Sequence, residues 1–344
     1  MSPAADRPLL EIERLEVEFD TRRGVVRGLR GVDLSIGRGE TLAIVGESGS
    51  GKSVTAQAVM GLIDVPGRIV GGDVRWKGHS LLSRSRARQA RDIRGKEIAL
   101  VFQDPMTSLN PLIRVGQQIS EVLRRHLGMT RADADLRVLD LLEAVGIPAP
   151  PRRAKQYPHE LSGGMRQRVM IAMAIACEPE LLIADEPTTA LDVTIQAQVL
   201  ELIAGLQETL GLSVLLITHD LGVVAGLCDR VAVMYAGQIV ETGSAEDVFE
   251  RPAHPYTQGL IRSTPRLDDH MERLVSIDGA PPSLLAPPPG CAFYERCPIA
   301  EARCATLPPL IPIPNRTAGS VACWRATTNA WDSASVPPGE LRAV

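Results

Sequence analysis

The stretch GESGSGKS, residues 46–53, has the residue types of a loop that binds phosphate. It follows the apolar run TLAIVG and opens the helical pattern SVTAQAVMGLI, which is the order of elements that a phosphate loop requires. Its glycines let backbone N–H groups surround the phosphates, and the helix N-terminus adds partial positive charge. Lys52 would reach the β- and γ-phosphates, and the Ser53 hydroxyl would bind Mg²⁺. The residues expected to contact a nucleotide here are Gly46, Glu47, Ser48, Gly49, Ser50, Gly51, Lys52, Ser53 and Val54.

A pair of carboxylates stands where a second apolar run, LLIADEP, comes to its end. In open α/β sheets, ligands collect at the carboxyl ends of the strands. Asp185 is suited to hold Mg²⁺, directly or through water, and Glu186 to polarise the water that attacks the γ-phosphate. An ordinary solvated acidic turn is the alternative. A phosphate loop in the same sheet pattern favours the catalytic interpretation, although kinases and GTPases also have such loops.

The stretch LSGGMRQR, residues 161–168, forms a second helix start that is rich in backbone donors. Ser162, Gly163 and Gly164 would suit an anion there. One nucleotide has no obvious need of two such loops.

Four of the six cysteines lie near the end of the chain, spaced Cys291-x5-Cys297-x6-Cys304-x18-Cys323. Thiolates bind zinc and iron–sulfur clusters. Structural zinc sites usually use pairs of cysteines two to four residues apart, which this spacing lacks, whereas a [4Fe–4S] cluster takes four cysteines. Unligated thiols are the third possibility. Cys177 and Cys228 lie in apolar helical patterns and are expected in the core.

Strand and helix patterns alternate along most of the chain, which predicts an α/β fold with a largely parallel sheet. LLEIERLEVEFD, residues 9–20, alternates as a half-buried strand does, and RVAVMYAGQIVE is expected to be one strand. A helical stretch interrupts the alternation and predicts a helical subdomain over about 105–180. The Pro-rich segment PPSLLAPPP follows a change in composition, so we predict a domain over 1–250 and a loop-rich extension over 251–344.

The composition of the 344-residue chain is that of a globular protein with a net charge of −4, so no positive field attracts nucleic acid. No apolar run approaches the roughly 20 residues that span a bilayer. The N-terminus carries acids where a signal peptide is basic and then apolar. We therefore expect a cytosolic protein that could still dock on a membrane protein.

The motifs together resemble those of ABC-type ATPases. LSGGMRQR resembles their signature motif, and it lies about 20 residues before the acidic strand end, as in that family. Gln103 in FQD resembles the Q-loop glutamine, Asp192 in ALD the D-loop aspartate, and His219 in ITHD the switch histidine. Phe19 resembles the aromatic residue that stacks on adenine, although a core position is its ordinary alternative. The resemblance extends over residues 9–245.

The resemblance implies how two such chains would hydrolyse ATP. Two domains pair head to tail, and each ATP lies between the phosphate loop of one and the signature loop of the other. Ser162, Gly163 and Gly164 would contact the ATP of the partner. Gln103 would sense the γ-phosphate, help bind Mg²⁺ and move the helical subdomain. His219 would hold the γ-phosphate and the attacking water.

Finer features resemble the ATPase subunits of bacterial oligopeptide and dipeptide importers. These are VFQDPMTSLNP, HPYTQGLIRSTP and Met165 in the signature loop. The resemblance implies a peripheral subunit on the cytoplasmic face of the membrane. Its expected partners are two permeases, an extracytoplasmic binding protein and a second, similar ATPase. The tail pattern GC-x-F-x-x-RC, with two later cysteines, also resembles this subfamily and implies a [4Fe–4S] cluster, with zinc as the second choice.

Three other functions are weighed against peptide import. Nickel importers are near relatives, but their ATPases generally resemble this chain less beyond the motor. A soluble ABC ATPase of DNA repair or translation usually carries two motors or long coiled insertions, whereas this chain has one motor and no heptad run. A scaffold that binds ATP without turnover would not need Glu186 and His219.

Overall fold

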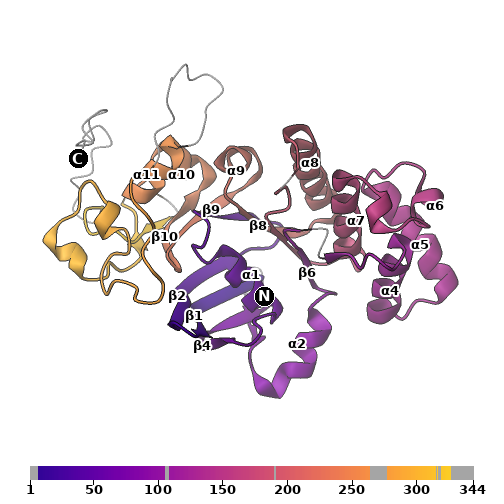
Figure 1. The fold of residues 1–344 in the computed structure, drawn as a ribbon, viewed down its shortest axis with the longest axis horizontal. Helices are drawn as coiled ribbons and strands as arrows, with labels where there is room; N and C mark the ends of the chain where they lie inside the picture. Colours follow the sequence, from indigo (N-terminus) through magenta and orange to yellow (C-terminus); the bar gives the residue numbers. More distant parts are fainter. Residues whose placement is uncertain are drawn as a thin grey trace, which may run out of the picture.

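The computed structural model describes residues 7–104, 108–189, 191–263, 277–314, 316 and 319–326. An eight-stranded sheet runs through its centre (Figure 1). Its strands, in spatial order, are β11 (Ile311–Pro312), β12 (Ser320–Val321), β10 (Gln238–Ser244), β9 (Arg230–Tyr235), β3 (Thr41–Val45), β8 (Ser213–Thr218), β7 (Leu181–Asp185) and β6 (Ile98–Val101). The five strands from β9 to β6 are parallel, which confirms the predicted α/β sheet. Their carboxyl ends therefore meet at one edge.

The prediction of a single strand over RVAVMYAGQIVE is wrong, because the chain reverses in its middle. Ala236 has φ 47° and Gly237 has φ 79°, and two consecutive left-handed residues form a tight hairpin turn. Strand β10 therefore returns antiparallel to β9, with Gln238 opposite Tyr235. Glycine after a small residue was the available sequence signal for this turn.

A second, antiparallel sheet lies beside the first and carries the N-terminal hairpin (Figure 1). Its strands, in spatial order, are β2 (Gly24–Ile36), β1 (Leu10–Thr21), β4 (Gly67–Trp76) and β5 (His79–Ser80). The strand predicted over residues 9–20 is confirmed as β1. Its alternate side chains Leu10, Ile12, Leu15 and Val17 are buried against helix α1 (Lys52–Met60) and the parallel sheet.

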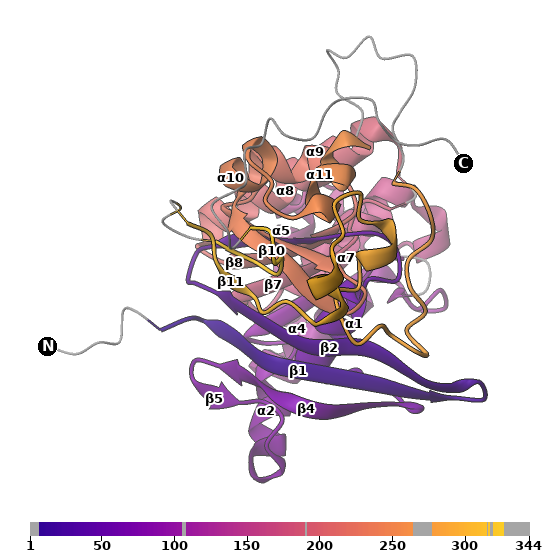
Figure 2. The ribbon, with the colours of Figure 1, turned by 90° about the vertical axis from the view of Figure 1, so that its left-hand side faces the viewer.

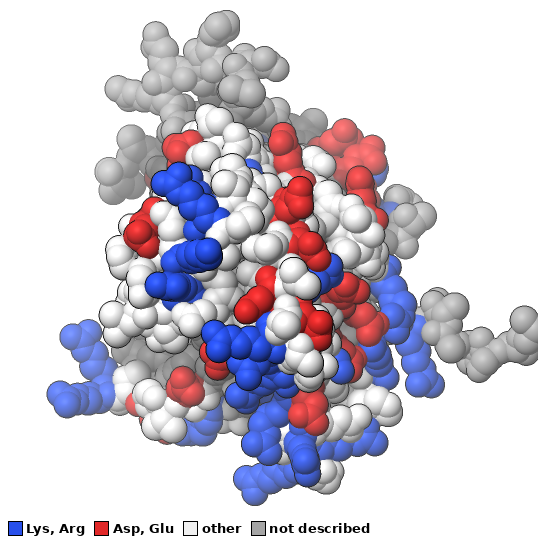
Figure 3. Space-filling view, turned by 90° about the vertical axis from the view of Figure 1, so that its right-hand side faces the viewer, with Lys and Arg blue, Asp and Glu red and all other residues white. Residues whose placement is uncertain are grey.

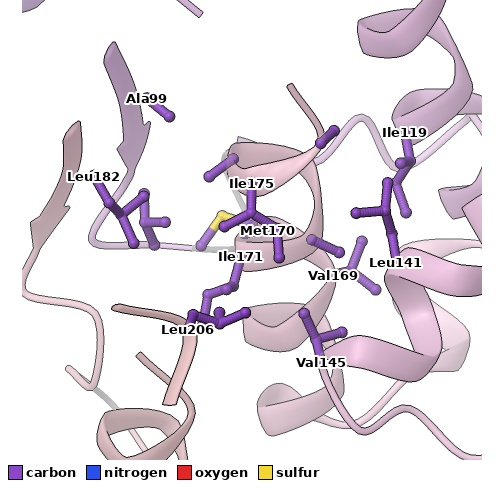
Figure 4. Close-up of a cluster of buried hydrophobic side chains, with 14 of the residues drawn as sticks. Ala99, Ile119, Leu141, Val145, Val169, Met170, Ile171, Ile175, Leu182 and Leu206 are labelled. Atoms are coloured by element: carbon purple, nitrogen blue, oxygen red, sulfur yellow. The ribbon is translucent and has the colours of Figure 1, made fainter. Parts of the chain in front are cut away.

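Helices that fall in the range predicted for a helical subdomain lie beyond the β6 end of the central sheet (Figure 1). The helices of this region are α4 (Val115–Leu127), α5 (Arg131–Ala144), α6 (Pro150–Arg153) and α7 (Gly163–Ile175). In Figure 4, α7 presents Val169 toward Ile119 and Val145, and Ile171 toward Leu206. Helix α7 therefore joins the subdomain to the sheet through one continuous apolar core. Residues 105–107 of the predicted range lie outside the described residues.

The outer face of this region carries charges of both signs (Figure 3). Lys and Arg side chains gather toward the lower edge of that view, whereas Asp and Glu are scattered above it. Helix α2 (Ala87–Ile93) and the turn η1 (Arg84–Arg86) contribute exposed arginines near the end of the antiparallel sheet. Charges of opposite sign on this face partly cancel each other's field.

The remaining described helices are α8 (Val193–Leu210), α9 (Leu221–Leu227), α10 (Ala245–Glu250) and α11 (Pro255–Arg262), with short turns η2 (Pro158–Glu160), η3 (Tyr294–Arg296) and η4 (Ala302–Ala305). The described part of the tail after residue 277 is mostly loop, and it lies along β10 and beside β2 (Figure 2). Strand β12 pairs with β10, so the tail extends the central sheet. The domain boundary near 250 stays a prediction. None of the helices in the described ranges is long and apolar enough to cross a bilayer.

Candidate functional site

The loop between β3 and α1 is pressed against the backbones of β9 and β2. A Cβ atom at Gly46 would lie 2.2 Å from the carbonyl oxygen of Met234, and one at Gly51 would lie 2.9 Å from that of Gly28. Both glycines also have positive φ values, 153° and 109°. Only glycine fits such close approaches between backbones. These positions therefore fix the loop as a tight cradle at the N-terminus of α1, a place in the fold that suits an anion.

Lys52 lies inside this cradle, at the first position of α1. Its side chain is 4% exposed, and its Nζ donates to the carbonyl oxygens of Gly46 at 2.9 Å and Glu47 at 3.1 Å. Burial lowers the pKa of Lys52, while the nearby carboxylates of Glu186, Asp185 and Glu47 oppose that shift. The loop thus holds the Lys52 ammonium in place through its own carbonyl groups.

Ser53 and Asp185 come together from α1 and the end of β7. The Ser53 Oγ donates to Asp185 Oδ1 at 3.0 Å. Burial raises the pKa of Asp185, and the hydrogen bond from Ser53 opposes the shift. A hydroxyl and a buried carboxylate are the hard oxygen ligands that Mg²⁺ takes in nucleotide sites, so this donor set fits the ion.

Glu186 follows Asp185 in a left-handed conformation, with φ 46°. Its Oε2 accepts hydrogen bonds from Gln103 Nε2 at 2.9 Å and from Thr189 Oγ1 at 2.8 Å. His219, just after β8, places its Nδ1 3.5 Å from Glu186 Oε1. The parallel register of β6, β7 and β8 brings Gln103, Glu186 and His219 to one edge of the sheet. Thr189 was not predicted from the sequence, although it stands one helical turn after Glu186.

A cavity of about 540 Å³ opens in front of these side chains. The predicted residues that line it are Phe19, Ser48, Gly49, Gly51, Lys52, Ser53, Val54, Gln103, Glu186 and His219. The other predicted residues of this region, Gly46, Glu47, Ser50 and Asp185, are not among the residues that line the cavity. Phe19 packs over Gly28, where a Cβ would lie 2.8 Å from its ring. The cavity therefore runs from an apolar end at Phe19 to a charged end at Lys52 and Glu186.

Sequence reasoning missed three residues that line the apolar end: Val26, Gly28 and Leu284. Val26 pairs directly with Phe19 across the β1–β2 hairpin, so the hairpin register could have identified it. Leu284 comes from the Pro-rich segment of the tail. No local pattern links it to this cavity.

Within one subunit, the signature loop is not part of this cavity. Ser162 caps α7 by accepting from the Met165 N–H at 3.3 Å, and Asp192 caps α8 by accepting from the Ile195 N–H at 3.0 Å. A Cβ at Gly164 would lie 2.7 Å from Ile195, so this glycine allows α7 and α8 to approach closely. Gly163 opens α7. Ala190, also in the predicted D-loop, lies outside the described residues.

The four tail cysteines line a second, small cavity together with His254, Phe293 and Trp324. All four are unbonded thiols. Burial raises the pKa of Cys291 to about 11 and of Cys297 to about 12, and it also raises the pKa of Cys323. Among the described residues, however, no group of three or more His, Cys, Asp or Glu side chains is arranged to hold a metal ion. The predicted metal-binding character of the extension is therefore not supported here.

Cys177 is buried, and Cys228 is half-buried against the core around α7, as expected. Burial raises the pKa of both thiols, that of Cys228 to about 12.

Comparison with known proteins decides the family. Residues 29–189 match the ABC transporter family, and residues 240–304 match the family described as the C-terminal region of oligopeptide/dipeptide transporters. The chain is 52% identical over 317 residues to the dipeptide transport ATP-binding protein DppD of Bacillus subtilis, covering 92% of this chain and 94% of the relative. This chain belongs to the ATP-binding proteins of the oligopeptide and dipeptide ABC transporters.

A second member of the family gives the same result. The chain is 51% identical over 309 residues to the oligopeptide transport ATP-binding protein OppD of Salmonella typhimurium, covering 90% of this chain and 92% of the relative.

Solved structures of ABC ATPases share the fold. The ATP-binding cassette MJ0796, bound to ADP and Pi as a dimer, is 28% identical with a TM-score of 0.61, over 69% of this chain and 98% of that one. The cbiO1 subunit of the Clostridium perfringens cbiONQ transporter is 30% identical with a TM-score of 0.60, over 72% and 93%. The fold of this family member is therefore that of an ABC ATPase.

Proposed function

We propose that this chain is the ATP-hydrolysing subunit that powers the import of dipeptides or oligopeptides through a membrane ABC transporter. One observation carries the proposal. The phosphate loop, Glu186 and His219 line a single cavity in a chain about half identical to dipeptide and oligopeptide transport proteins. The chain would sit on the cytoplasmic face of the membrane, against two permeases that receive peptide from an extracytoplasmic binding protein.

The polar side chains at the charged end of the cavity, Asp185 beside it and the ring of Phe19 would share the work of this reaction. Lys52 would bind the β- and γ-phosphates, and Phe19 would stack on the adenine. Ser53, Asp185 and the amide oxygen of Gln103 would hold Mg²⁺, which neutralises the charge of the phosphates. Glu186 would accept a hydrogen bond from the attacking water and orient it toward the γ-phosphate. His219 would hold that water and the γ-phosphate from the other side.

The signature loop would act on the ATP of a partner subunit. Ser162 caps α7 and Gly163 and Gly164 open it, and none of the three lines this subunit's own cavity. Such a helix start binds anions well, so a partner's γ-phosphate fits its chemistry. Asp192 lies near the same face, as the first residue before α8.

The change Ser162→Arg tests this arrangement. We expect the isolated chain to bind ATP normally, while turnover in the assembled transporter falls at least about tenfold, because aligned donors contribute about 10²–10³ to kcat. Ser162→Thr is the matched control, since its hydroxyl preserves the α7 cap. If Ser162→Arg weakens ATP binding in the isolated chain, the loop acts within its own subunit instead.

Peptide import is tested with the complete transporter in vesicles, with ATP supplied on the side of this chain. Labelled dipeptides and longer peptides should accumulate only when ATP, the permeases and the binding protein are all present. ATP hydrolysis that none of these dipeptides or longer peptides stimulates would contradict the peptide assignment and leave the ATPase assignment intact.

We also propose that the four tail cysteines bind a [4Fe–4S] cluster, with zinc as the alternative. The support is the donor set: four thiols from three separate stretches line one cavity, as a four-cysteine ligand set requires. The cluster would stabilise a loop-rich segment that has little apolar core of its own.

Metal analysis of protein purified without oxygen tests the cysteine site. We expect about four iron and four sulfide per chain with a brown chromophore, both lost in Cys297→Ser. Cys177→Ser is the control and should retain them. One zinc without colour would favour the alternative. Neither metal, even after reconstitution with iron and sulfide, would contradict the site.

A further inference from the structure

The C-terminal tail contacts the back of the phosphate loop through a buried arginine. Arg296 belongs to the η3 turn, and its side chain is 5% exposed. Its Nη1 donates to Glu47 Oε2 at 2.8 Å and its Nη2 to Glu47 Oε1 at 3.0 Å. This is a two-pronged arginine–carboxylate pair, which has the strongest and most directional geometry available to side chains.

Further contacts hold the arginine rigidly. Its Nε donates to the carbonyl oxygen of Asp278 at 2.9 Å, and its Nη1 also donates to Tyr235 Oη at 3.1 Å. The ring of Tyr235 packs against those of Tyr256 and Phe293, with centroids 4.5 Å and 5.4 Å away. The guanidinium therefore has a fixed position, set by the tail and by β9.

Glu47 is held at its backbone as well as at its carboxylate. The Glu47 N–H donates to Tyr256 Oη at 2.8 Å, and Tyr256 is a fully buried residue of α11. The Glu47 carbonyl oxygen accepts from Lys52 Nζ. One residue of the phosphate loop is thus fixed by α11, by the η3 turn and by the nucleotide-binding lysine.

The charge of Glu47 gives this pair a consequence for ATP. A carboxylate in a loop that binds three phosphates opposes the approach of the negatively charged nucleotide. The guanidinium of Arg296 neutralises that charge and holds the carboxylate outside the cavity. Accordingly, Glu47 does not line the cavity, whereas its neighbours Ser48 and Gly49 do. Without Arg296, the carboxylate would be free to turn toward the phosphates.

The tail also reaches the opposite, apolar end of the cavity. Leu284 lines it beside Phe19 and Val26, and the Leu284 carbonyl oxygen accepts from the Arg27 N–H of β2 at 2.9 Å. Four residues later, the Pro288 carbonyl accepts from Arg30 Nη2 at 3.0 Å. The Pro-rich segment therefore runs along the outer edge of β2, where Figure 2 shows the tail.

We propose that the C-terminal tail completes the nucleotide site of its own subunit. Arg296 is a positioning residue that sets the phosphate loop through Glu47, and Leu284 forms part of the wall that receives the base and ribose. This inference rests on the proposed ATP site and adds to it a segment that lies more than 230 residues beyond the phosphate loop.

The first test titrates MgATP into the purified full chain. Arg296→Gln should raise the Kd about tenfold. Removing one charge of a buried pair leaves the other, the Glu47 carboxylate, unpaired beside the phosphates. The Kd of Arg296→Lys should lie between those of wild type and Arg296→Gln, since lysine keeps the charge and loses the two-pronged geometry. Arg262→Gln, at an exposed arginine of α11, is the matched control and should stay within twofold of wild type.

A double variant separates positioning by charge from loss of folding. Glu47→Gln with Arg296→Gln removes both charges, so it should bind MgATP more tightly than Arg296→Gln alone, by at least threefold. In the assembled transporter, Arg296→Gln should raise KM for ATP and leave kcat nearly unchanged. An Arg296→Gln Kd within twofold of wild type, or a double variant no better than the single one, would overturn the proposal.

The second test separates the two ends of the cavity. Leu284→Ala should raise the Kd for MgATP about fivefold through lost apolar contact. It should leave competition by inorganic tripolyphosphate unchanged, whereas Arg296→Gln should weaken that competition. Leu285→Ala, at the exposed neighbour, is the control. Equal effects of Leu284→Ala and Leu285→Ala would overturn the role of Leu284. A wild-type chain that fails to bind MgATP would instead reject the ATP site itself.

Discussion

Replacing Glu186 with Gln is expected to lower the turnover number for ATP by at least about 100-fold, because a positioned general base contributes about 10²–10⁴. The amide can still bond to Gln103 and Thr189, which now donate to Glu186 Oε2 at 2.9 and 2.8 Å. It cannot carry the negative charge that polarises the attacking water. The substitution therefore removes the chemistry while it preserves the local structure.

Phosphate release in the assembled transporter measures this effect, together with ATP retention on a filter. The variant should keep ATP bound and unhydrolysed. Glu201→Gln, at an exposed position on α8, is the matched control and should hydrolyse ATP normally. Turnover of Glu186→Gln close to that of wild type would show that another group activates the water.

Replacing Lys52 with Met is expected to weaken ATP binding at least about 100-fold, since hydrogen bonds to a charged group contribute about 1.5–3 kcal/mol and this ammonium would bond two phosphates. Methionine has nearly the same length and shape, so the space stays filled. The buried carbonyls of Gly46 and Glu47 lose their donor at the same time. We therefore expect a second effect, a loss of about 1–3 kcal/mol in unfolding free energy.

Calorimetric titration with MgATP and chemical denaturation measure the two effects of Lys52→Met separately. Lys155→Met serves as the control for loss of a lysine elsewhere, in the loop after α6. If Lys52→Met binds ATP as tightly as wild type, Lys52 only supports the loop and does not contact phosphate.

The sequence by itself determined the parts of this protein that are built from neighbouring residues. The phosphate loop is one run of residues between a strand and a helix, so its types and spacing were enough to predict it. The same holds for the acidic end of β7 and for the strand β1, whose alternation marks one buried face. Periodicity is a pattern of neighbouring residues, so it marks which face of an element is apolar whatever that face later packs against.

Other features needed both the sequence and the tertiary structure. Gln103 and His219 were identified by resemblance, but only the parallel pairing of β6, β7 and β8 shows that they meet at Glu186. The hairpin at Ala236 and Gly237 was missed, because continuous apolar residues on both sides hide a turn of two residues.

Only the tertiary structure decided what the tail touches. Arg296 and Glu47 are 249 positions apart, and nothing in either neighbourhood specifies the other. An arginine can pair with any carboxylate that the fold brings within reach, so its partner depends on how distant segments close into one core. The same reason applies to Leu284, which lies in a Pro-rich segment without periodicity and yet forms a wall of the nucleotide cavity.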